Sequence, residues 1–227
     1  DDASCGLSNG AASCSMSGGI SPYSVFWPST EDTILAVTNL ASGIYSVIIT
    51  DSMNCSKTDS VNIGDTPRPT LSIDTQSSVT CNGGTDGAVS LITNSGTGQI
   101  NYSWSPPVST GQSASGLSGG IYTVTVNDSA GCRDSLSLQI NEPAPLAMIL
   151  FVTDVACFGA ANGEIFVDAG GGTPPYNYLW NPGGQTADTA KNLTPGTYSV
   201  LLTDQNLCTA SASADVDQPT AMTSTVV

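Results

Sequence analysis

Apolar and polar residues alternate strictly in a stretch near the middle of the chain. Tyr122, Val124 and Val126 are separated by Thr123 and Thr125, the pattern of a β-strand with one buried face. The same inner row recurs as Tyr45, Val47 and Ile49, and as Tyr198, Val200 and Leu202. Each copy follows a Gly, ends at an Asp and has a Cys four residues later: Gly43, Asp51 and Cys55; Gly120, Asp128 and Cys132; Gly196, Asp204 and Cys208. We predict three equivalent strands, each ended by a turn.

Other residues repeat with the same period as these strands. Cys5, Cys81 and Cys157 lie 76 residues apart, and Trp27, Trp104 and Trp180 lie 77 and 76 apart. Agreement between independent markers indicates three copies of one unit. We place repeat 1 at residues 1–66, repeat 2 at 67–142 and repeat 3 at 143–218.

The two ends of the chain differ from this pattern. Repeat 1 lacks the strand that precedes Cys81 and Cys157, whereas residues 219–227 match the start of such a strand. We therefore expect a segment of a longer array, with residues 220–227 frayed or paired with another chain. Any export signal or anchor is expected to lie outside this sequence.

Signals for helices are nearly absent. Repeat 2 shows the predicted strands at residues 70–80, 88–93 and 99–105, in a short stretch ending at Leu117, and at 120–127 and 132–140. Six or seven short strands are typical of an immunoglobulin-like sandwich, and the Leu-x-x-Gly-x-Tyr turn resembles the tyrosine corner of that fold. The predicted fold is all-β, with three tandem immunoglobulin-like β-sandwich repeats of about 76 residues. Prolines between the repeats should extend the linkers and give an elongated rod.

The composition limits the partners and the compartment. The net charge is −15, and the four cations are Lys57, Arg68, Arg133 and Lys191, so nucleic acid and anionic lipid surfaces would be repelled. The longest apolar run, residues 146–152, is too short to cross a bilayer, so no direct membrane insertion is expected. Seven cysteines without any His argue against zinc and for disulfides in an extracellular setting.

Catalytic chemistry has little support in the sequence. Without His, the chain cannot build a Ser-His-Asp or Cys-His nucleophile. Glu31, Glu142 and Glu164 occupy unrelated positions in the repeats, and the recurring Asp residues lie in strand-end turns, so paired catalytic carboxylates are not expected. We predict that the chain is not an enzyme, with no catalytic residues and no cofactor.

Two sets of residues could form ligand sites, but each set also has a simpler structural interpretation. The three Trp residues could form a platform on which sugars stack, but their polar neighbours and the buried Trp of immunoglobulin-like sandwiches favour the core. Calcium is the other candidate ligand. The acidic turns lack the dense Asp spacing of a calcium loop, and Asp86-Gly87 and Asn162-Gly163 are turn dipeptides, so we predict no metal ligands.

The cysteine spacing suggests one disulfide in each repeat. We predict the pairs Cys5 with Cys55, Cys81 with Cys132, and Cys157 with Cys208, which are 50, 51 and 51 residues apart. Cys14 is expected to be a free, buried thiol, because it aligns with Leu91 and Val167 on the inward row. The pairing requires one reversal of the chain between Trp104 and Leu117, so that an even number of strands returns it to the same pole. An odd number of strands would place the two cysteines at opposite poles and forbid the bond.

Several linked motifs are similar to one known repeat. They are Cys-x-Gly-x-x-Asp-Gly at 81–87, Gly-Gly-Thr-Pro-Pro-Tyr-x-Tyr-x-Trp at 171–180, the Leu-x-x-Gly-x-Tyr-x-Val turn, Gly-Cys, and Glu-Pro at 142–143. Together they resemble the SprB repeat of large cell-surface gliding-motility adhesins of Bacteroidota. Repeat 1 departs in placing Asn9-Gly10 one residue early, and repeat 2 lacks the Pro-Pro-Tyr element. The resemblance implies type nine secretion, a cell-surface location and a thread that contacts the substratum during gliding.

A short motif is similar to the O-glycosylation signal of the same phylum, namely Asp followed by Ser or Thr and then an apolar residue. It occurs at Thr33, Ser52, Ser60, Ser129, Ser135 and Thr189. The simpler interpretation is a set of turn dipeptides in a Ser- and Thr-rich chain.

Two functions are consistent with these observations. The first is a structural segment of an extracellular stalk or filament that extends an adhesin, with neighbouring repeats or copies of the same chain as partners. The second is a module in which each repeat binds a polysaccharide or another surface ligand, which requires exposed aromatic side chains.

Overall fold

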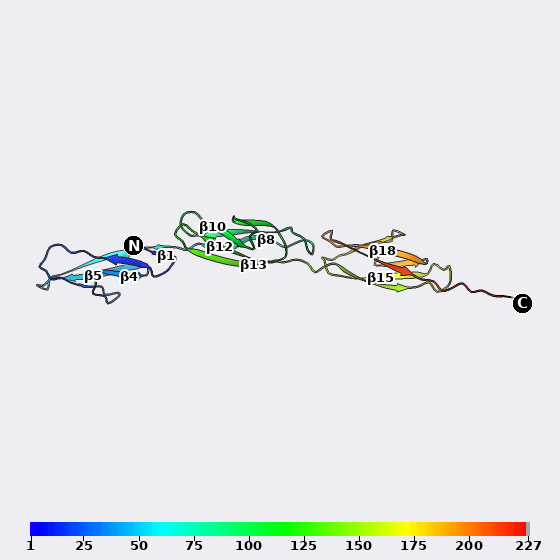
Figure 1. Cartoon of the computed structure of the whole chain (residues 1–227), viewed down its shortest axis with the longest axis horizontal. Helices are drawn as coiled ribbons and strands as arrows, with labels where there is room; N and C mark the ends of the chain where they lie inside the picture. Colours follow the sequence, from blue (N-terminus) through cyan, green and yellow to red (C-terminus); the bar gives the residue numbers. More distant parts are fainter. Residues whose placement is uncertain (226–227) are drawn as a thin grey trace. The chain divides into compact units, whose positions relative to one another are not determined.

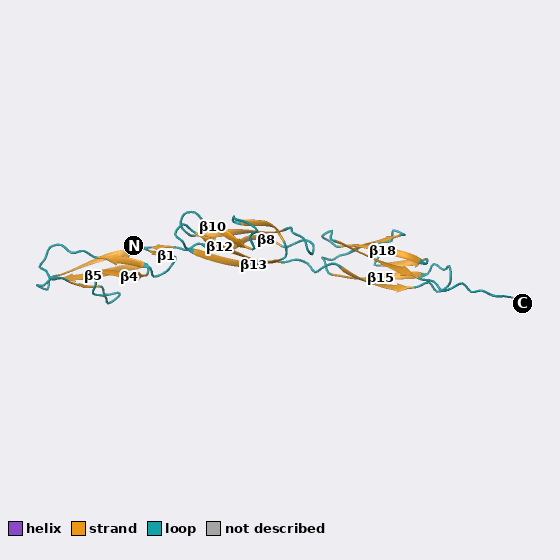
Figure 2. Ribbon diagram, viewed as in Figure 1, coloured by secondary structure: helices purple, strands orange, loops and turns teal. Residues whose placement is uncertain are grey.

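The computed structural model describes residues 1–225, and every regular element in this range is a β-strand (Figure 2). The predicted all-β class is therefore confirmed. No helix within the described range is long and apolar enough to cross a membrane. Residues 217–225 form no strand, and the last two residues of the segment predicted to begin a further strand, 226 and 227, lie outside the described part.

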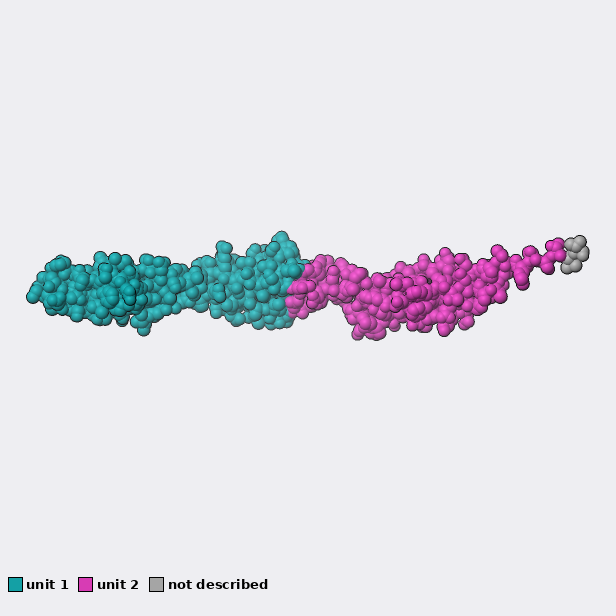
Figure 3. Space-filling model, turned by 90° about the horizontal axis from the view of Figure 1, so that it is seen from below, with its two compact units in different colours: residues 1–75, 89–114, 121–138 teal, residues 76–88, 115–120, 139–227 magenta. Residues whose placement is uncertain are grey.

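The chain divides into two compact units (Figure 3). Unit 1 contains residues 1–75, 89–114 and 121–138, and unit 2 contains residues 76–88, 115–120 and 139–227. Unit 1 therefore holds all of repeat 1, unit 2 holds all of repeat 3, and repeat 2 contributes to both.

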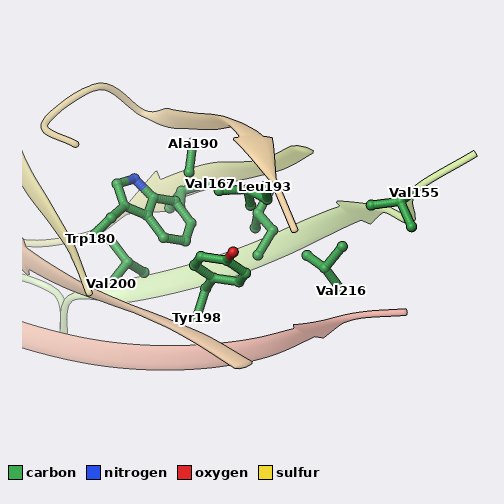
Figure 4. Packing of buried hydrophobic residues seen from close by; sticks show 9 residues of the cluster. Val155, Val167, Trp180, Ala190, Leu193, Tyr198, Val200 and Val216 are labelled. Atoms are coloured by element: carbon green, nitrogen blue, oxygen red, sulfur yellow. The ribbon is translucent and has the colours of Figure 1, made fainter. Parts of the chain in front are cut away.

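Repeat 3 is a sandwich of two antiparallel three-stranded sheets (Figure 1). One sheet has the order β14 (Ala147–Thr153), β15 (Gly163–Gly170), β17 (Thr189–Leu193). The other has the order β16 (Asn177–Asn181), β18 (Gly196–Thr203), β19 (Thr209–Val216). The predicted inner row of Tyr198, Val200 and Leu202 is buried, and Figure 4 shows Tyr198 and Val200 beside Trp180 in the core. This arrangement confirms an immunoglobulin-like sandwich.

Strands β16 and β17 together make a single pass across the sandwich. In β16, Asn177 pairs with Thr203 at the end of β18, whereas Asn181 reaches only Ser199. The chain then changes sheets, and β17 continues in the same direction until Leu193 pairs with Gly163 at the opposite pole. Between them lie Pro182, which has no N–H for a ladder, and two glycines with positive φ. Repeat 2 has the same sheet orders, so the reversal predicted for its equivalent stretch, between Trp104 and Leu117, is wrong.

Repeat 1 has the same second sheet but a shorter first sheet. Its strands are β1 (Ala3–Ser4), β2 (Gly10–Ser13), β3 (Ser24–Phe26), β4 (Ala36–Leu40), β5 (Gly43–Thr50), β6 (Ser56–Ile63) and β7 (Asp65–Thr66). Strands β3, β5 and β6 form one sheet, β2 pairs only with β4, and β1 pairs in parallel with β7. Among the described residues no strand takes the place that β14 has beside β15. Tyr45 and Ile49 are accordingly half-buried, whereas Val47 is buried.

Repeat 2 contains both three-stranded sheets. Its strands are β8 (Thr70–Ser77), β9 (Gly87–Asn94), β10 (Asn101–Ser105), β11 (Ser113–Leu117), β12 (Gly120–Asn127) and β13 (Arg133–Ile140). The sheet orders are β11-β9-β8 and β10-β12-β13, which match those of repeat 3. The inner row of Tyr122, Val124 and Val126 is buried as predicted.

The three tryptophans are core residues. Trp27, Trp104 and Trp180 are 2%, 4% and 1% exposed. Each indole N–H donates to a carbonyl seven residues later, on Ile34, Gly111 and Ala187 at 3.0, 2.9 and 3.0 Å. The hydrogen bond ties the strand before the change of sheet to the connection that follows it. Core packing is confirmed, and a sugar-stacking platform built from these indoles is excluded.

The expected tyrosine corner is present in repeat 3. The Tyr198 hydroxyl donates to the Thr194 carbonyl oxygen at 3.0 Å, which fastens the turn before β18 to the strand. A Tyr198→Phe substitution should lower the free energy of unfolding by about 1 kcal/mol, because one carbonyl loses its partner while the ring stays in place. Urea denaturation of both proteins measures this difference, and an unchanged midpoint would contradict a structural role for the hydroxyl.

Candidate functional site

The strand-end Asp of repeat 3 organises two loops at one pole of the sandwich. Asp204 is 1% exposed. Its Oδ1 accepts hydrogen bonds from the N–H groups of Asn206 and Cys208, both at 2.9 Å, and its Oδ2 accepts one from Thr173 at 2.8 Å. The carboxylate thus fixes the turn before β19, including Cys208, against the loop that follows β15.

Asp51 and Asp128 repeat this arrangement. Asp128 is buried and accepts from the N–H groups of Cys132 at 2.8 Å and Thr97 at 2.9 Å. Asp51 accepts from Met53, Cys55 and Ile20 at 2.9, 3.0 and 3.2 Å. In all three repeats the second cysteine is therefore held by a carboxylate four residues earlier.

The hydrogen bonds also set the charge of these groups. For Asp51 the N–H of Cys55 is the largest influence, and the pKa is lowered. For Asp128 and Asp204 burial is the largest single influence and acts to raise the pKa, but several backbone N–H groups together outweigh it and leave the pKa below its ordinary range. The three carboxylates are therefore ionised at neutral pH and serve as structural acceptors.

The loops that carry the first cysteine are fixed by a different polar residue. Asp86 accepts hydrogen bonds from the backbone N–H of Thr80 at 3.0 Å and from its hydroxyl, and the Thr80 hydroxyl is the main cause of a lowered Asp86 pKa. At the equivalent positions Asn162 accepts from Ala156 at 3.1 Å and Asn9 from Ser4 at 2.8 Å. Asp86 and Asn162, interpreted from the sequence as parts of turn dipeptides, therefore also hold the loop that leads to the cysteine, and Asn9 has the same role in repeat 1.

Two disulfides join cysteines of consecutive repeats. Cys5 bonds to Cys132 within unit 1 and Cys81 bonds to Cys208 within unit 2, with Cα–Cα distances of 5.3 and 5.7 Å. Both pairs are 127 residues apart in sequence. The three predicted pairs within single repeats are therefore wrong: Cys5 does not bond to Cys55, Cys81 does not bond to Cys132, and Cys157 does not bond to Cys208.

The reason for this difference is the single pass that changes sheets. Three passes separate the loop of Cys157 from the turn of Cys208: β15, then β16 with β17, then β18. An odd number of passes puts the two cysteines at opposite poles of one sandwich. Within unit 2 the first cysteine of repeat 2 instead meets the second cysteine of repeat 3. Asn206 supports this junction, because its side-chain amide donates to the Thr80 carbonyl at 3.2 Å.

Three thiols are free, and they differ in exposure. Cys14 is free as predicted, although it is half-buried against the core of repeat 1 and not fully buried. Cys55 and Cys157, predicted to be bonded, are free and exposed.

The remaining candidate residues lie apart from these junctions or have structural partners. Among the six glycosylation candidates, Thr189 is half-buried and the others, Thr33, Ser52, Ser60, Ser129 and Ser135, are exposed. The Ser52 hydroxyl donates to the Ile20 carbonyl at 3.0 Å, and the Ser129 hydroxyl accepts from the Gln99 N–H at 2.9 Å. Within residues 1–225 no three acidic or sulfur side chains are grouped so that they could hold a metal ion. The possible glycosylation of these residues and the absence of metal ligands stay predictions.

The depressed pKa values predict a loss of stability in acid. A carboxyl group whose pKa is lower in the folded state stabilises the fold above its unfolded pKa, and this contribution disappears as the pH falls through the folded value. The native chain should therefore lose stability below about pH 4. Asp204→Asn should be less stable at pH 7, because an amide N–H₂ must face one of the three backbone donors, and its stability should depend less on pH in acid. Thermal melting from pH 7 to 2 checks this, and two parallel curves would contradict it.

Comparison with known proteins agrees with this architecture. The crystal structure of the Down Syndrome Cell Adhesion Molecule (DSCAM), N-terminal eight immunoglobulin domains, aligns with a TM-score of 0.50 and 14% identity over 97% of this chain and 36% of that one. The chain thus spans about a third of that structure, and the likeness concerns the fold alone. Three N-terminal domains of the outer capsid protein Hoc of bacteriophage RB49 align with a TM-score of 0.44 and 13% identity, over 95% and 96% of the two chains. No curated protein matches the chain.

The family comparison addresses the repeat itself. Residues 73–109 and 150–185 match the SprB repeat. These segments cover most of the first half of repeats 2 and 3, including the loops of Cys81 and Cys157, the strands that follow them and the buried Trp. The SprB-type repeat predicted from the sequence is thus confirmed at two segments of this chain.

Proposed function

We propose that the chain is a load-bearing, non-enzymatic segment of a repetitive cell-surface adhesin, of the kind that serves in gliding motility. The observation that carries this proposal is the overlap of the two disulfides. The loop closed by Cys5 and Cys132 and the loop closed by Cys81 and Cys208 share the residues between Cys81 and Cys132. A chain cross-linked in this way resists extension even after its sandwiches unfold.

Location and chemistry support the same role. Disulfides persist outside the reducing cytosol, and SprB repeats occur in surface adhesins, so an extracellular location after type nine secretion fits both. The recurring carboxylates of Asp51, Asp128 and Asp204 are occupied by backbone N–H groups. They hold the loops in place and are not free for acid-base chemistry, which favours a mechanical role over an enzymatic one.

Pulling on the chain tests the load-bearing role. With both disulfides intact, the shortest covalent path between the ends runs through the residues between Cys81 and Cys132, so full extension should reach roughly a third of that of the reduced chain. Cys208→Ser should give an intermediate length, and Cys157→Ser should match the native chain. Single-molecule force spectroscopy measures these lengths. Equal extension of the oxidised and reduced native chains would contradict the proposal.

Binding of a surface ligand is a second candidate function, favoured by one exposed aromatic pair in repeat 3. Phe151 on β14 is paired with Phe166 on the neighbouring strand β15, and their stacked rings have centroids 6.0 Å apart. Their side chains lie on the outer face of the sheet, where the residues are 54% and 40% exposed. Such a pair offers a flat apolar surface for sugar rings or another apolar ligand.

A glycan array tests this second function. Phe166→Ser should reduce binding of any polysaccharide by about tenfold while the fold is kept, because the side chain points away from the core. Tyr198→Phe alters a buried residue and should bind as the native chain does. Absence of glycan binding by the native chain, or equal binding by Phe166→Ser, would exclude the aromatic pair as the site.

A further inference from the structure

Strand β14 lies at the edge of its sheet in repeat 3. It pairs with β15 on one side, and in the order β14-β15-β17 no described strand follows it on the other side. Repeat 2, which lies between two other repeats in the sequence, likewise has β8 at the edge of the sheet β11-β9-β8. The edge position therefore belongs to the sandwich itself. Such a strand presents backbone N–H and C=O groups that can pair with a further strand.

In repeat 2 polar side chains occupy this edge. The N–H of Leu71 on β8 donates to a carboxylate oxygen of Asp134 on β13 at 2.8 Å. The side-chain amide of Gln76 on β8 donates to the carbonyl of Gln139 on β13 at 2.7 Å. The edge of β8 is thus bridged to β13 near both of its ends, and Asp74 adds a charge that discourages pairing with another chain.

Repeat 3 lacks these polar groups. Ala210 and Val152 stand at the positions of Asp134 and Gln76, and neither has a hydrogen-bonding side chain. The seven residues of β14 include no charged residue and no proline. In repeats 2 and 3, the other edge strands of at least this length, β8, β13 and β19, each carry a charge. In a chain with a net charge of −15, β14 is therefore the long edge that another copy can approach without bringing charges of the two strands together.

The outer side chains of β14 are apolar. Ile149 and Phe151 face outward, and the ring of Phe166 on β15 stacks on that of Phe151. Ala147 has the place that Leu71 has in β8, where the N–H points to the free edge. Because such groups recur at every second residue of an antiparallel strand, Ile149 and Phe151 also direct their N–H and C=O groups to this edge. The same two residues thus carry backbone groups for pairing and side chains for packing.

We propose that β14 pairs with β14 of a second copy of this chain, antiparallel and about a two-fold axis at Leu150. Each Ile149 then lies opposite Phe151 of the second copy, and the two residues exchange backbone hydrogen bonds. The Phe166 rings flank this seam on both sides, so the outer side chains of the two copies form one continuous apolar surface. The two-fold axis makes each contact occur twice and leaves no further edge of this kind open.

The acidic residues of this face lie away from the seam. Glu164 and Asp168 stand on β15, opposite Thr153 and Ile149. In the dimer the two β15 strands are three strand spacings apart, roughly 14 Å. This distance exceeds the Debye length of about 8 Å at physiological salt, so repulsion between their carboxylates is screened. Asp154 follows the end of β14, and the two-fold axis places its two copies at opposite ends of the seam.

Strand pairing goes beyond the load-bearing role, because it would join such chains side by side. It also differs from ligand binding by the aromatic pair of repeat 3. Pairing requires the open backbone edge of β14, whereas stacking of a sugar requires the two exposed rings. A substitution that closes the edge and leaves the rings in place therefore separates the two functions.

The state of association in solution tests the proposal. The exposed thiols of Cys55 and Cys157 are first alkylated, so that association depends on the strand edge alone. In sedimentation equilibrium at up to about 1 mM, the range of weak interfaces, the native chain should form a dimer and no larger species. Ile149→Lys places a charge in the seam and should weaken the dimer at least tenfold. Ile121→Lys is the control and should dimerise as the native chain does, because Ile121 is more exposed (70% against 59%) but lies on the central strand β12.

A second pair of variants tests the edge itself. Ala210→Asp gives β14 the carboxylate that Asp134 provides to β8, and should prevent the dimer while both Phe rings stay exposed. Ser211→Asp lies on the outward row of the same strand and should keep the dimer. A native chain that stays monomeric, or a dimer that persists equally in Ile149→Lys or Ala210→Asp, would overturn strand pairing. Glycan binding that survives in Ala210→Asp while the dimer is lost would support both functions as separate properties.

Discussion

The disulfide pairing of this molecule depends on a change of sheet in one pass of each sandwich, the pass made by β16 and β17 in repeat 3. In repeat 3, Pro182 and the two glycines after it end β16 halfway across, and β17 completes the pass in the other sheet. Each sandwich therefore has an odd number of passes between its two cysteines. The first cysteine lies at one pole and the second at the other, so a bond can form only with another repeat.

Polar side chains fix the loops that carry the two cysteines of each disulfide. Asp204 fixes the turn of Cys208 through three backbone N–H groups, and Asp86 fixes the loop of Cys81 through Thr80. Because these loops are ordered by hydrogen bonds within their own repeat, little conformational entropy is left to lose when the cysteines meet. In the chain-entropy model, a closed loop of 127 residues stabilises the folded state by about 5 kcal/mol. That is a large contribution for sandwiches of this size.

The local features of the fold were predictable from sequence, whereas the cysteine pairing was not. Alternation around Tyr122 and Tyr198 predicted the buried rows, and the polar neighbours of the tryptophans indicated their place in the core. The cysteine pairing depended on whether the chain reverses its direction within residues 105–117 or continues in the same direction in the other sheet. A short stretch that contains Pro and Gly is compatible with either course of the chain. The signal that could have decided it was the common separation of 127 residues, which is one repeat longer than the spacing within a repeat. The supporting role of Asn162 was missed because a single polar residue beside Gly is common in turns.

Identification of the disulfides in the oxidised chain tests the account most directly. Proteolysis without reduction, followed by mass spectrometry of the linked peptides, should find Cys5 joined to Cys132 and Cys81 joined to Cys208, with Cys14 free. Mild reduction should separate these peptides and leave all seven cysteines available for alkylation. Peptides that join Cys81 to Cys132 or Cys157 to Cys208 would place both cysteines of a repeat at one pole, and would contradict the single pass that changes sheets.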